Sequence, residues 1–270
     1  MTLAVDFELR GKWALVTGST AGIGFAIAKA LAEEGASLVV NGRTEARVAA
    51  AVEALRSIAS TAGGELRGVA ADVGSKAGCG SLLSAVPQLD ILVNSVGIFE
   101  AKPFGEISDE DWLRFFEVNV LSGVRLSRAY LPGMLARNWG RILFISSESA
   151  LQIPVEMIHY GMTKTAQLAV ARGLAELTAG SAVTVNSILP GPTKSEGVAD
   201  FVNGLAEQQG KSASDVERDF FLHARPTSLL KRFETPEEIA VLAAFVASPR
   251  ASGVNGAALR VDGGVVRAVG

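Results

Sequence analysis

Short, almost wholly apolar runs alternate with longer Ala- and Leu-rich runs along the whole chain. The short runs show no alternation of polar and apolar positions, which is typical of strands covered on both faces. They predict strands over 13–17, 37–41, 66–70, 90–94, 141–146, 183–188 and 258–261. The longer runs predict helices over 22–34, 45–60, 75–85, 109–137, 158–178 and 236–247. This order predicts a single α/β domain over 1–270, a three-layer, doubly wound parallel β-sheet.

Local signals sharpen two helix starts and set one segment apart. Ser108 with Asp111 resembles a capping box, and Thr235 before Pro236 fits an N-cap with proline at the first helical position. The least regular stretch, 190–235, follows the sixth predicted strand. Because such sheets bind ligands at the carboxyl ends of their strands, we expect this stretch to form a lid over the substrate.

Composition narrows the classes of function. The net charge is −3 over 270 residues, which gives no support for binding nucleic acid or an anionic membrane. The single cysteine, Cys79, excludes an internal disulfide and a cysteine-cluster metal site, and we expect no metal. The start of the chain carries acids and no apolar run of signal-peptide type, and no stretch approaches the ~20 apolar residues of a membrane span. We therefore expect a cytoplasmic protein.

A glycine-rich turn follows the first predicted strand, T-G-S-T-A-G-I-G from Thr17 to Gly24. Its glycines allow a tight turn and close approach of a phosphate to the backbone, and the helix that follows offers free N–H groups. No Lys-Ser/Thr pair follows, so it is not a Walker loop. Any tight turn between a strand and a helix can use glycine. Taken by itself, the loop is therefore also explained as an ordinary turn that binds no phosphate. The residues predicted to touch a cofactor are Gly18, Ser19, Thr20, Gly22, Ile23 and Gly24.

The stretch E-M-I-H-Y-G-M-T-K, 156–164, places Tyr160 four residues before Lys164. On a helix, the two side chains share one face. A cation close to a phenol favours the phenolate and lowers its pKa, so this pair suits proton transfer. An ordinary aromatic beside an ordinary lysine explains the spacing equally well when it stands alone.

Further motifs in order make the chain similar to the short-chain dehydrogenases/reductases, and within them to 3-oxoacyl-acyl-carrier-protein reductases. The family pattern is matched by the glycine turn, Asp72-Val73, N-S-V-G from Asn94 to Gly97, Asn119, Ser146-Ser147, Tyr160 with Lys164, P-G-P-T from Pro190 to Thr193, R-F-E-T-P-E-E-I-A and V-D-G-G. The resemblance covers nearly the whole chain. It implies a Rossmann fold and hydride transfer between a nicotinamide cofactor and a carbonyl or alcohol.

The resemblance also implies roles for single residues. Tyr160 would be the general acid/base, and Lys164 would support it and hydrogen-bond the nicotinamide ribose. Ser147, 13 residues before Tyr160, would hydrogen-bond the reacting oxygen, while Asn119 would hold the helix geometry and a proton-relaying water. Further cofactor contacts would come from Asp72, Val73, Asn94, Gly97, Pro190, Gly191 and Thr193.

The end of the second strand predicts NADP(H), with NAD(H) as the alternative. Gly42 stands where NAD-preferring relatives usually carry an aspartate, and Arg43 can pair with a 2′-phosphate. Ala21 points the other way, because many NADP-dependent relatives carry a basic residue there.

The substrate is less defined by the sequence. Phe99, Leu151, Ile153 and Ile158 predict an apolar pocket for a ketone or acyl-type carbonyl, with Glu148 and Glu156 at its rim. A 3-oxoacyl-carrier-protein reductase is the specific alternative, although Asn138 and Ser181 stand where such relatives tend to have arginine. A non-catalytic dinucleotide-binding protein and an extended, epimerase-like relative remain less favoured. The resemblance implies a homotetramer, or else a dimer.

Four residues near the motifs have plainer readings. We expect Ser146 to be a strand-end serine and Cys79 to be a small, largely buried side chain. Tyr130 has no lysine four residues on and should pack on a helix. His159 next to Tyr160 should lie at the pocket rim or surface, because successive helix residues point in different directions.

Overall fold

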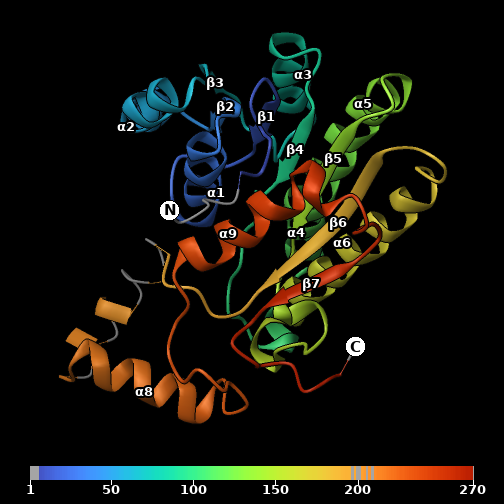
Figure 1. Cartoon of the computed structure of the whole chain (residues 1–270). Coiled ribbons are helices and arrows are strands. Elements are labelled where there is room, and N and C mark those ends of the chain that lie inside the picture. Colours follow the sequence, from blue (N-terminus) through green and yellow to red (C-terminus); the bar gives the residue numbers. More distant parts are fainter. Residues whose placement is uncertain (1–5, 196–197, 199–201, 205, 208–209, 270) are drawn as a thin grey trace.

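The protein, described by a computed structural model, is a seven-stranded parallel sheet between two layers of helices (Figure 1). The structure describes residues 6–269 apart from 196–197, 199–201, 205 and 208–209. The strand order is β3-β2-β1-β4-β5-β6-β7, and every pairing is parallel. The predicted doubly wound sheet is therefore confirmed. The strands are β1 Trp13–Val16, β2 Ser37–Gly42, β3 Leu66–Ala70, β4 Ile91–Asn94, β5 Gly140–Ile145, β6 Val183–Pro190 and β7 Ala258–Val261.

Helices cover both faces of the sheet because successive strand residues point to opposite sides. Ala14 and Val16 of β1 pack in one apolar cluster with α1 and α9, whereas Leu15 packs in the other with α3, α5 and α6. The helices are α1 Gly22–Glu33, α2 Glu45–Ala62, α3 Lys76–Ala85, α4 Asp109–Phe116, α5 Ser122–Ala136, α6 Ile158–Glu176, α8 Ala213–His223 and α9 Pro236–Val246. Short 3₁₀ turns lie at Phe104–Glu106, Glu148–Ala150, Val155–Met157 and Pro249–Ala251.

The predicted capping box of Ser108 and the predicted N-cap of Thr235 are both present, and the second also proves to be a capping box. Ser108 and Asp111 cap α4 reciprocally, and Thr235 and Glu238 cap α9 with Pro236 at its first position. Asp72 does not cap α3, whose cap is Ser75; its carboxylate instead accepts the Gly74 amide at 3.0 Å. Capping signals were thus reliable where the side chain and the third helical residue both matched.

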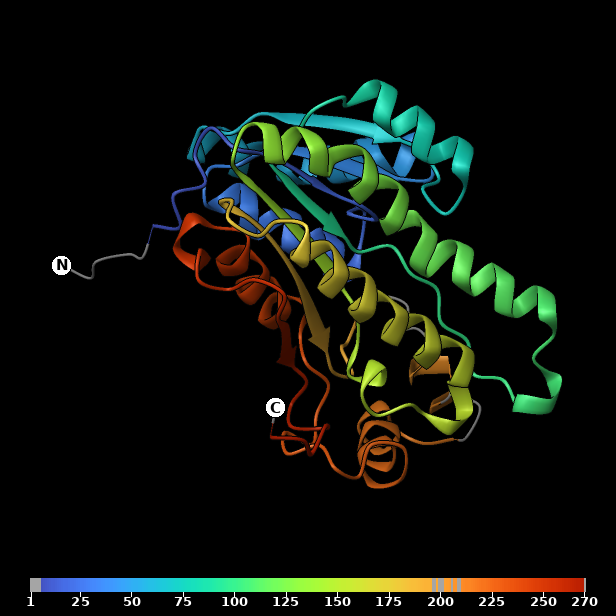
Figure 2. The same cartoon turned by 90° about the vertical axis from the view of Figure 1, so that its right-hand side faces the viewer.

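Two predicted elements were wrong in detail. The helix expected over 109–137 is broken by a π-helical segment, Glu117–Leu121, between α4 and α5, which follow one another along the green path in Figure 2. The apolar spacing continues through the break, so periodicity alone could not reveal it. The stretch 190–235, expected to be irregular, contains α8, which Ser212 caps by accepting the Asp215 amide.

The carboxyl ends of the strands gather the loops that carry the predicted motifs. The glycine turn follows β1, Gly97 follows β4, Ser147 follows β5 and Gly191 follows β6. Within the described ranges, no helix is both long and apolar enough to cross a membrane. The same residues hold no group of three or more His, Cys, Asp or Glu able to bind a metal ion.

Candidate active site

The glycine turn is a close-packed loop at the start of α1. Gly18 and Gly22 have φ angles of 68° and 55°, in the left-handed region that favours glycine. A Cβ on Gly24 would lie 2.5 Å from the Gly18 carbonyl oxygen, so this position has no room for a side chain. Ala21 precedes the helix without a side-chain cap, which leaves the first N–H groups of α1 available to an anion. The loop therefore fits a phosphate group.

Other predicted residues hold this loop onto β2 rather than facing outward. Ser19 is buried; its amide donates to the Asn41 carbonyl at 2.9 Å and its hydroxyl accepts the Asn41 amide at 3.0 Å. A Cβ on Gly42 would lie 2.5 Å from the Thr20 methyl group, so Gly42 makes room for Thr20. Arg43 follows at once and is exposed, at the end of β2 next to the loop.

The predicted adenine and nicotinamide positions differ in burial. Asp72 is exposed and Val73 is buried, immediately before α3. Asn94 is buried at the end of β4, where its Nδ2 donates to Ser127 Oγ at 3.4 Å and its Oδ1 has no hydrogen-bond partner. Gly97 is exposed in the loop beyond it.

Asn119 lies in the π-helical segment and clamps the loop after β4. Its Oδ1 accepts the Ile98 amide at 2.7 Å and its Nδ2 donates to the Ile98 carbonyl at 2.9 Å. Nδ2 also donates to Thr163 Oγ1 at 3.0 Å, which ties the segment to α6. Asn119 thus joins three elements around the site.

Lys164 lies on α6, and its side chain is buried near Asn119 and Gly97. Its Nζ donates to the Ile145 carbonyl at 3.0 Å and to Gln167 Oε1 at 3.3 Å. An ammonium has three donors, so one remains for a ligand hydroxyl. Burial lowers the pKa of Lys164 to about 8. A Cβ on Gly97 would lie 3.3 Å from Nζ, so glycine leaves the ammonium accessible from the loop.

Gln167 is a site residue that the sequence reasoning missed. It is buried, and its Nε2 donates to the Asn119 main-chain carbonyl at 2.6 Å while its Oε1 accepts from Lys164. The side chain therefore bridges the ammonium and the π-helical segment. The one available signal was its place three residues after Lys164, on the same face of a helix.

Tyr160 lies one helical turn before Lys164, with Lys164 Nζ 5.6 Å from the centre of its ring. The ring of Phe99 meets it edge-on at 6.3 Å. Burial raises the pKa of Tyr160 above its usual range, and the neighbouring Ser147 hydroxyl lowers it in part. The sequence reasoning expected Lys164 to depress this pKa; in the protein alone, desolvation of the phenol outweighs the neighbouring charges.

Ser147 lies directly after β5 and meets a partner that the sequence reasoning placed elsewhere. Its Oγ donates to Glu148 Oε2 at 2.5 Å and accepts the Ser149 amide at 3.1 Å. Glu148, expected at the rim, is buried. Because a hydroxyl has one proton, Ser147 must turn that proton away from Glu148 to stabilise charge on a reacting oxygen. Ser146 instead donates to the Lys164 carbonyl at 3.0 Å.

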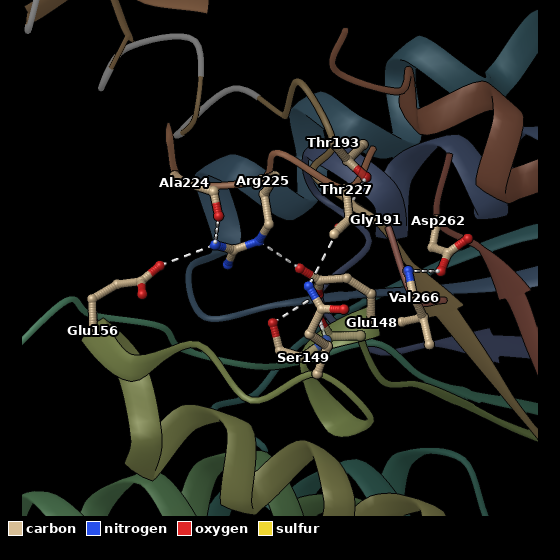
Figure 3. A network of polar contacts seen from close by, with 12 residues as sticks. Glu148, Ser149, Glu156, Gly191, Thr193, Ala224, Arg225, Thr227, Asp262 and Val266 are labelled. Atoms are coloured by element: carbon tan, nitrogen blue, oxygen red, sulfur yellow. Dashed lines mark hydrogen bonds and ion pairs between the residues drawn. The ribbon is translucent and has the colours of Figure 1, made fainter. Parts of the chain in front are cut away.

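The buried carboxylate is paired with Arg225, from just after α8 (Figure 3). Arg225 Nε donates to Glu148 Oε1 at 2.9 Å, and Nη1 donates to Glu156 Oε1 at 3.0 Å. Burial works against the charge on Arg225, yet the two carboxylates raise its pKa. Residues of 190–235 and residues beside Ser147 thus form one polar network. No local pattern in the sequence links Arg225 to Glu148, since 77 residues separate them.

The P-G-P-T stretch ends β6 and is held by a second buried carboxylate. Glu234 Oε2 accepts the Gly191 amide at 3.0 Å, and Glu234 forms an isolated bridge with Thr193. Thr193 Oγ1 donates to the Gly191 carbonyl at 2.9 Å. Burial raises the pKa of Glu234 to about 7. Pro190 itself is buried in the strand.

Three other residues resolve simply. His159 is fully buried, contrary to the expected rim position, with its ring 4.1 Å from that of Phe115 and 6.0 Å from that of Trp112. It faces aromatic side chains of α4 because that face of α6 packs inward. Cys79 is buried, as expected. Tyr130 is buried and donates to the Val86 carbonyl at 2.7 Å.

Three of the apolar side chains predicted for the substrate pocket are exposed. Phe99, Leu151 and Ile153 are 58%, 47% and 42% exposed, whereas the charged Glu148 is buried. The predicted burial of these groups was therefore wrong: the apolar side chains are exposed and Glu148 is buried. The ion pair with Arg225, which lets Glu148 be buried, has no signal in the local sequence.

The comparisons agree with this geometry. A family model described as Enoyl-(Acyl carrier protein) reductase matches residues 18–266. The chain is 49% identical over 265 residues to "Uncharacterized oxidoreductase YvaG" of Bacillus subtilis, covering 98% of this chain and 100% of that relative. It is 35% identical to a D-beta-hydroxybutyrate dehydrogenase of Cupriavidus necator, covering 96% and 99%.

Solved structures give the same result. L-sorbose reductase from Gluconobacter frateurii, complexed with NADPH and L-sorbose, superposes with a TM-score of 0.90 at 32% identity, covering 98% of this chain and 100% of that one. Together with the sheet order and the site at its carboxyl edge, these matches identify the family. The chain belongs to the short-chain dehydrogenases/reductases, oxidoreductases that act on CH–OH groups.

Proposed function

We propose that the protein is an NADP(H)-dependent oxidoreductase that interconverts a carbonyl group and a secondary alcohol, with Tyr160 as general acid/base. One observation carries the proposal. Tyr160, the buried ammonium of Lys164 and the Ser147 hydroxyl meet at the carboxyl edge of the sheet, on the side where the glycine turn opens α1. A phenol between a cation and a hydroxyl suits proton exchange with a substrate oxygen.

The chain's residues fit a dinucleotide. Gly18 to Gly24 and the first turn of α1 would hold its phosphates, and Asp72 with Val73 would border the adenine. The spare Lys164 donor and the side-chain-free Gly97 leave room for the nicotinamide ribose. The loop from Asn94 and the stretch from Pro190 through Gly191 to Thr193 would border the ring. When bound, the cofactor supplies or takes the hydride.

The side chains of the protein move the proton. Tyr160 would donate its proton to a carbonyl oxygen in reduction, or accept one from an alcohol in oxidation. Lys164 holds its ammonium 5.6 Å from the centre of the phenol ring, and its charge would favour the phenolate. Asn119 and Gln167 would hold Lys164 and the loop after β4 in place. Ser147 would turn its proton to the oxygen that gains charge.

NADP(H) is proposed over NAD(H) on the residues that end β2. Gly42 is packed against Thr20, so a carboxylate there has no room, and Arg43 is exposed where a 2′-phosphate would lie. The NADPH bound to the L-sorbose reductase structure favours the same choice. Replacing Arg43 by Ala should raise the KM for NADPH much more than that for NADH; equal effects would refute the preference.

A small carbonyl compound is the proposed substrate. The buried Glu148–Arg225 pair beside Ser147 favours a polar substrate, as does the likeness to a reductase complexed with L-sorbose. The carrier-protein alternative gains little, because Asn138 accepts the Ala182 amide at 2.9 Å and Ser181 donates to the Thr178 carbonyl at 2.7 Å. Neither residue offers a positive charge to an acidic carrier.

The setting of the enzyme is part of the same proposal. We infer a cytoplasmic homotetramer, with a dimer as the alternative, by analogy with the family. The 190–235 segment is proposed as the lid over the substrate, because it contributes Arg225 to the network beside Ser147. Light scattering of the purified protein checks the oligomer directly.

A purified-enzyme screen tests the activity. NADPH oxidation is followed with ketones, sugars and 3-oxoacyl thioesters, and Tyr160→Phe serves as the control. We expect turnover with at least one small carbonyl compound and its loss in the variant, by about 100-fold or more, as for removal of a general acid. Tight NADPH binding without turnover of any carbonyl or alcohol would favour a non-catalytic dinucleotide-binding protein.

A further inference from the structure

Both carboxylate oxygens of Glu148 accept hydrogen bonds, from groups in two parts of the chain. Its Oε2 accepts from Ser147 at 2.5 Å and from Ser149 Oγ at 2.7 Å. Its Oε1 accepts from Arg225 Nε at 2.9 Å. Glu148 is 3% exposed and Arg225 is 7% exposed, so the pair is withdrawn from water.

The direction of the Ser147 hydroxyl follows from this arrangement. The Ser149 amide occupies one lone pair of its oxygen at 3.1 Å, and its single proton lies on the line to the carboxylate. Hydrogen bonds to a charged acceptor are short and strongly directional. Glu148 therefore fixes the position of the Ser147 oxygen, from which the proton can turn to a reacting oxygen when a substrate binds.

Arg225 in turn fixes Glu148. A buried carboxylate without a counter-charge is strongly destabilising, so the guanidinium offsets that cost and holds Glu148 in place. Two further contacts of Nη1 hold the guanidinium, one to Glu156 at 3.0 Å and one to the Ala224 carbonyl at 2.9 Å (Figure 3). Nearby, Gln152 Nε2 donates to Thr227 Oγ1 at 3.4 Å, a second link between the same two parts of the chain.

Tyr160 responds to the same groups. After burial and the Ser147 hydroxyl, the charge of Glu148 raises its pKa and that of Arg225 lowers it. Loss of either charge alone would therefore change the acidity of the phenol as well as the position of the Ser147 oxygen.

We propose that Arg225 is a positioning residue for the reaction, which acts on Ser147 only through the Glu148 carboxylate. The inference rests on the proposed function. It means that Arg225, directly after α8, contributes to the catalytic geometry from a part of the chain distant in sequence. The chain Arg225–Glu148–Ser147 also explains why a charged pair lies buried beside the serine.

A double-mutant cycle between Arg225→Met and Glu148→Gln tests the dependence. With Glu148 present, Arg225→Met should lower kcat by about tenfold or more, because the Ser147 oxygen loses its fixed position. In the Glu148→Gln protein, the same change should alter kcat by less than about twofold, because the neutral amide needs no counter-charge. The dissociation constant for NADPH should stay within about twofold throughout.

An equal fall in kcat in both backgrounds would overturn the proposal, since Arg225 would then act independently of Glu148. If the Arg225→Met single variant does not fold, Arg225→Lys takes its place in the cycle. It keeps the positive charge but loses the branched donor group of arginine. Asp219→Asn is the matched control. It breaks an ion pair of 2.7 Å with Lys211 in the same segment and should leave kcat within about twofold.

A readout that needs no turnover separates this proposal from the proposed function. Arg225→Met should lower the thermal unfolding midpoint more in the Glu148 protein than in the Glu148→Gln protein, because only the former buries an unpaired charge. Equal shifts would contradict the coupling even in an inactive protein. The proposed function is tested first, by turnover in the wild type that is lost in Tyr160→Phe. If that test succeeds and the kcat cycle fails, only the role of Arg225 is refuted.

Discussion

The two sides of Tyr160 are built differently. On the Lys164 side, the ammonium donates to two neutral groups, the Ile145 carbonyl and the Gln167 amide. On the Ser147 side, the hydroxyl meets the carboxylate of Glu148, which pairs with Arg225. The groups on the Lys164 side belong to β5 and to α6, which packs on the sheet. The Ser147 side also includes Arg225, which lies within 190–235.

The difference shows how one site can hold buried charge in two ways. Lys164 has no carboxylate partner among the residues that the structure describes, and burial lowers its pKa to about 8. Its charge is thus available to a ligand and to the phenol. Glu148 and Arg225 neutralise one another, so their contribution is direction rather than net charge. We expect the Lys164 side to control the cofactor and acid strength, and the Ser147 side to control the geometry at the substrate.

Removing the charge of the first side should have the largest effect. Lys164→Met should lower kcat/KM for NADPH by about 100-fold or more, since it removes both the cation near the phenol and a ribose donor. In the wild type, the pKa of about 8 means that the ammonium is lost as pH rises through that value. Its kcat/KM for NADPH should therefore fall above about pH 8, and that of Lys164→Met should not.

Steady-state rates between about pH 6 and pH 10 check both statements. A wild-type profile that stays level through this range would show that the buried amine does not titrate as its surroundings imply. An identical alkaline fall in Lys164→Met would assign the fall to another group.

Crowding the first side should have an intermediate effect. In Gly97→Ala, the new Cβ would lie 3.3 Å from Lys164 Nζ and 3.5 Å from Asn119 Oδ1. A small displacement of the ammonium should lower kcat/KM for NADPH by about tenfold. Gly80→Ala, whose Cβ would meet nothing within 4 Å, is the matched control. Equal activity in both variants would mean that the loop after β4 has no influence on Lys164.

The smallest expected effect concerns Glu234 and appears in the pH dependence of stability. Burial raises the pKa of Glu234 from 4.5 to about 7, so the folded state keeps a proton that the unfolded state loses. Stability from this group is present at low pH and declines as pH rises from 4.5 through 7. The decline should reach about 3 kcal/mol at most.

Glu234→Gln keeps an acceptor for the Gly191 amide and has no proton to lose. Urea unfolding at about pH 5 and about pH 8 should therefore show a smaller loss of stability for the variant than for the wild type. Identical losses would mean that Glu234 titrates normally.

Much of the fold followed from local patterns. The apolar runs located all seven strands within two residues at each end, because strands covered on both faces carry few polar side chains. Ser108 and Thr235 located helix starts because their caps involve neighbours in sequence. The π-helical segment was not predicted because the apolar spacing runs through it, and the contacts of its Asn119 with Ile98 join residues far apart in sequence.

In the site, too, contacts between residues close in sequence were predictable and long-range contacts were not. Tyr160 and Lys164 could be predicted together because a helix brings residues four apart onto one face. Gln167 was predictable in principle by the same rule. Arg225 was not, because its partner Glu148 lies 77 residues away and nothing local marks either as buried. The sequence therefore predicted the Lys164 side well and the Ser147 side only in part.

The most direct test of the two-sided account compares one residue from each side. Gln167→Leu removes the bridge between Lys164 and the Asn119 carbonyl, and Ser147→Ala removes the hydroxyl. NADPH dissociation constants and kcat/KM for the best carbonyl substrate are measured for both. Gln167→Leu should weaken NADPH binding by about fivefold, whereas Ser147→Ala should leave it within about twofold and lower kcat/KM for the carbonyl by about 100-fold. Unchanged NADPH affinity in Gln167→Leu, or equal weakening in both variants, would contradict the account.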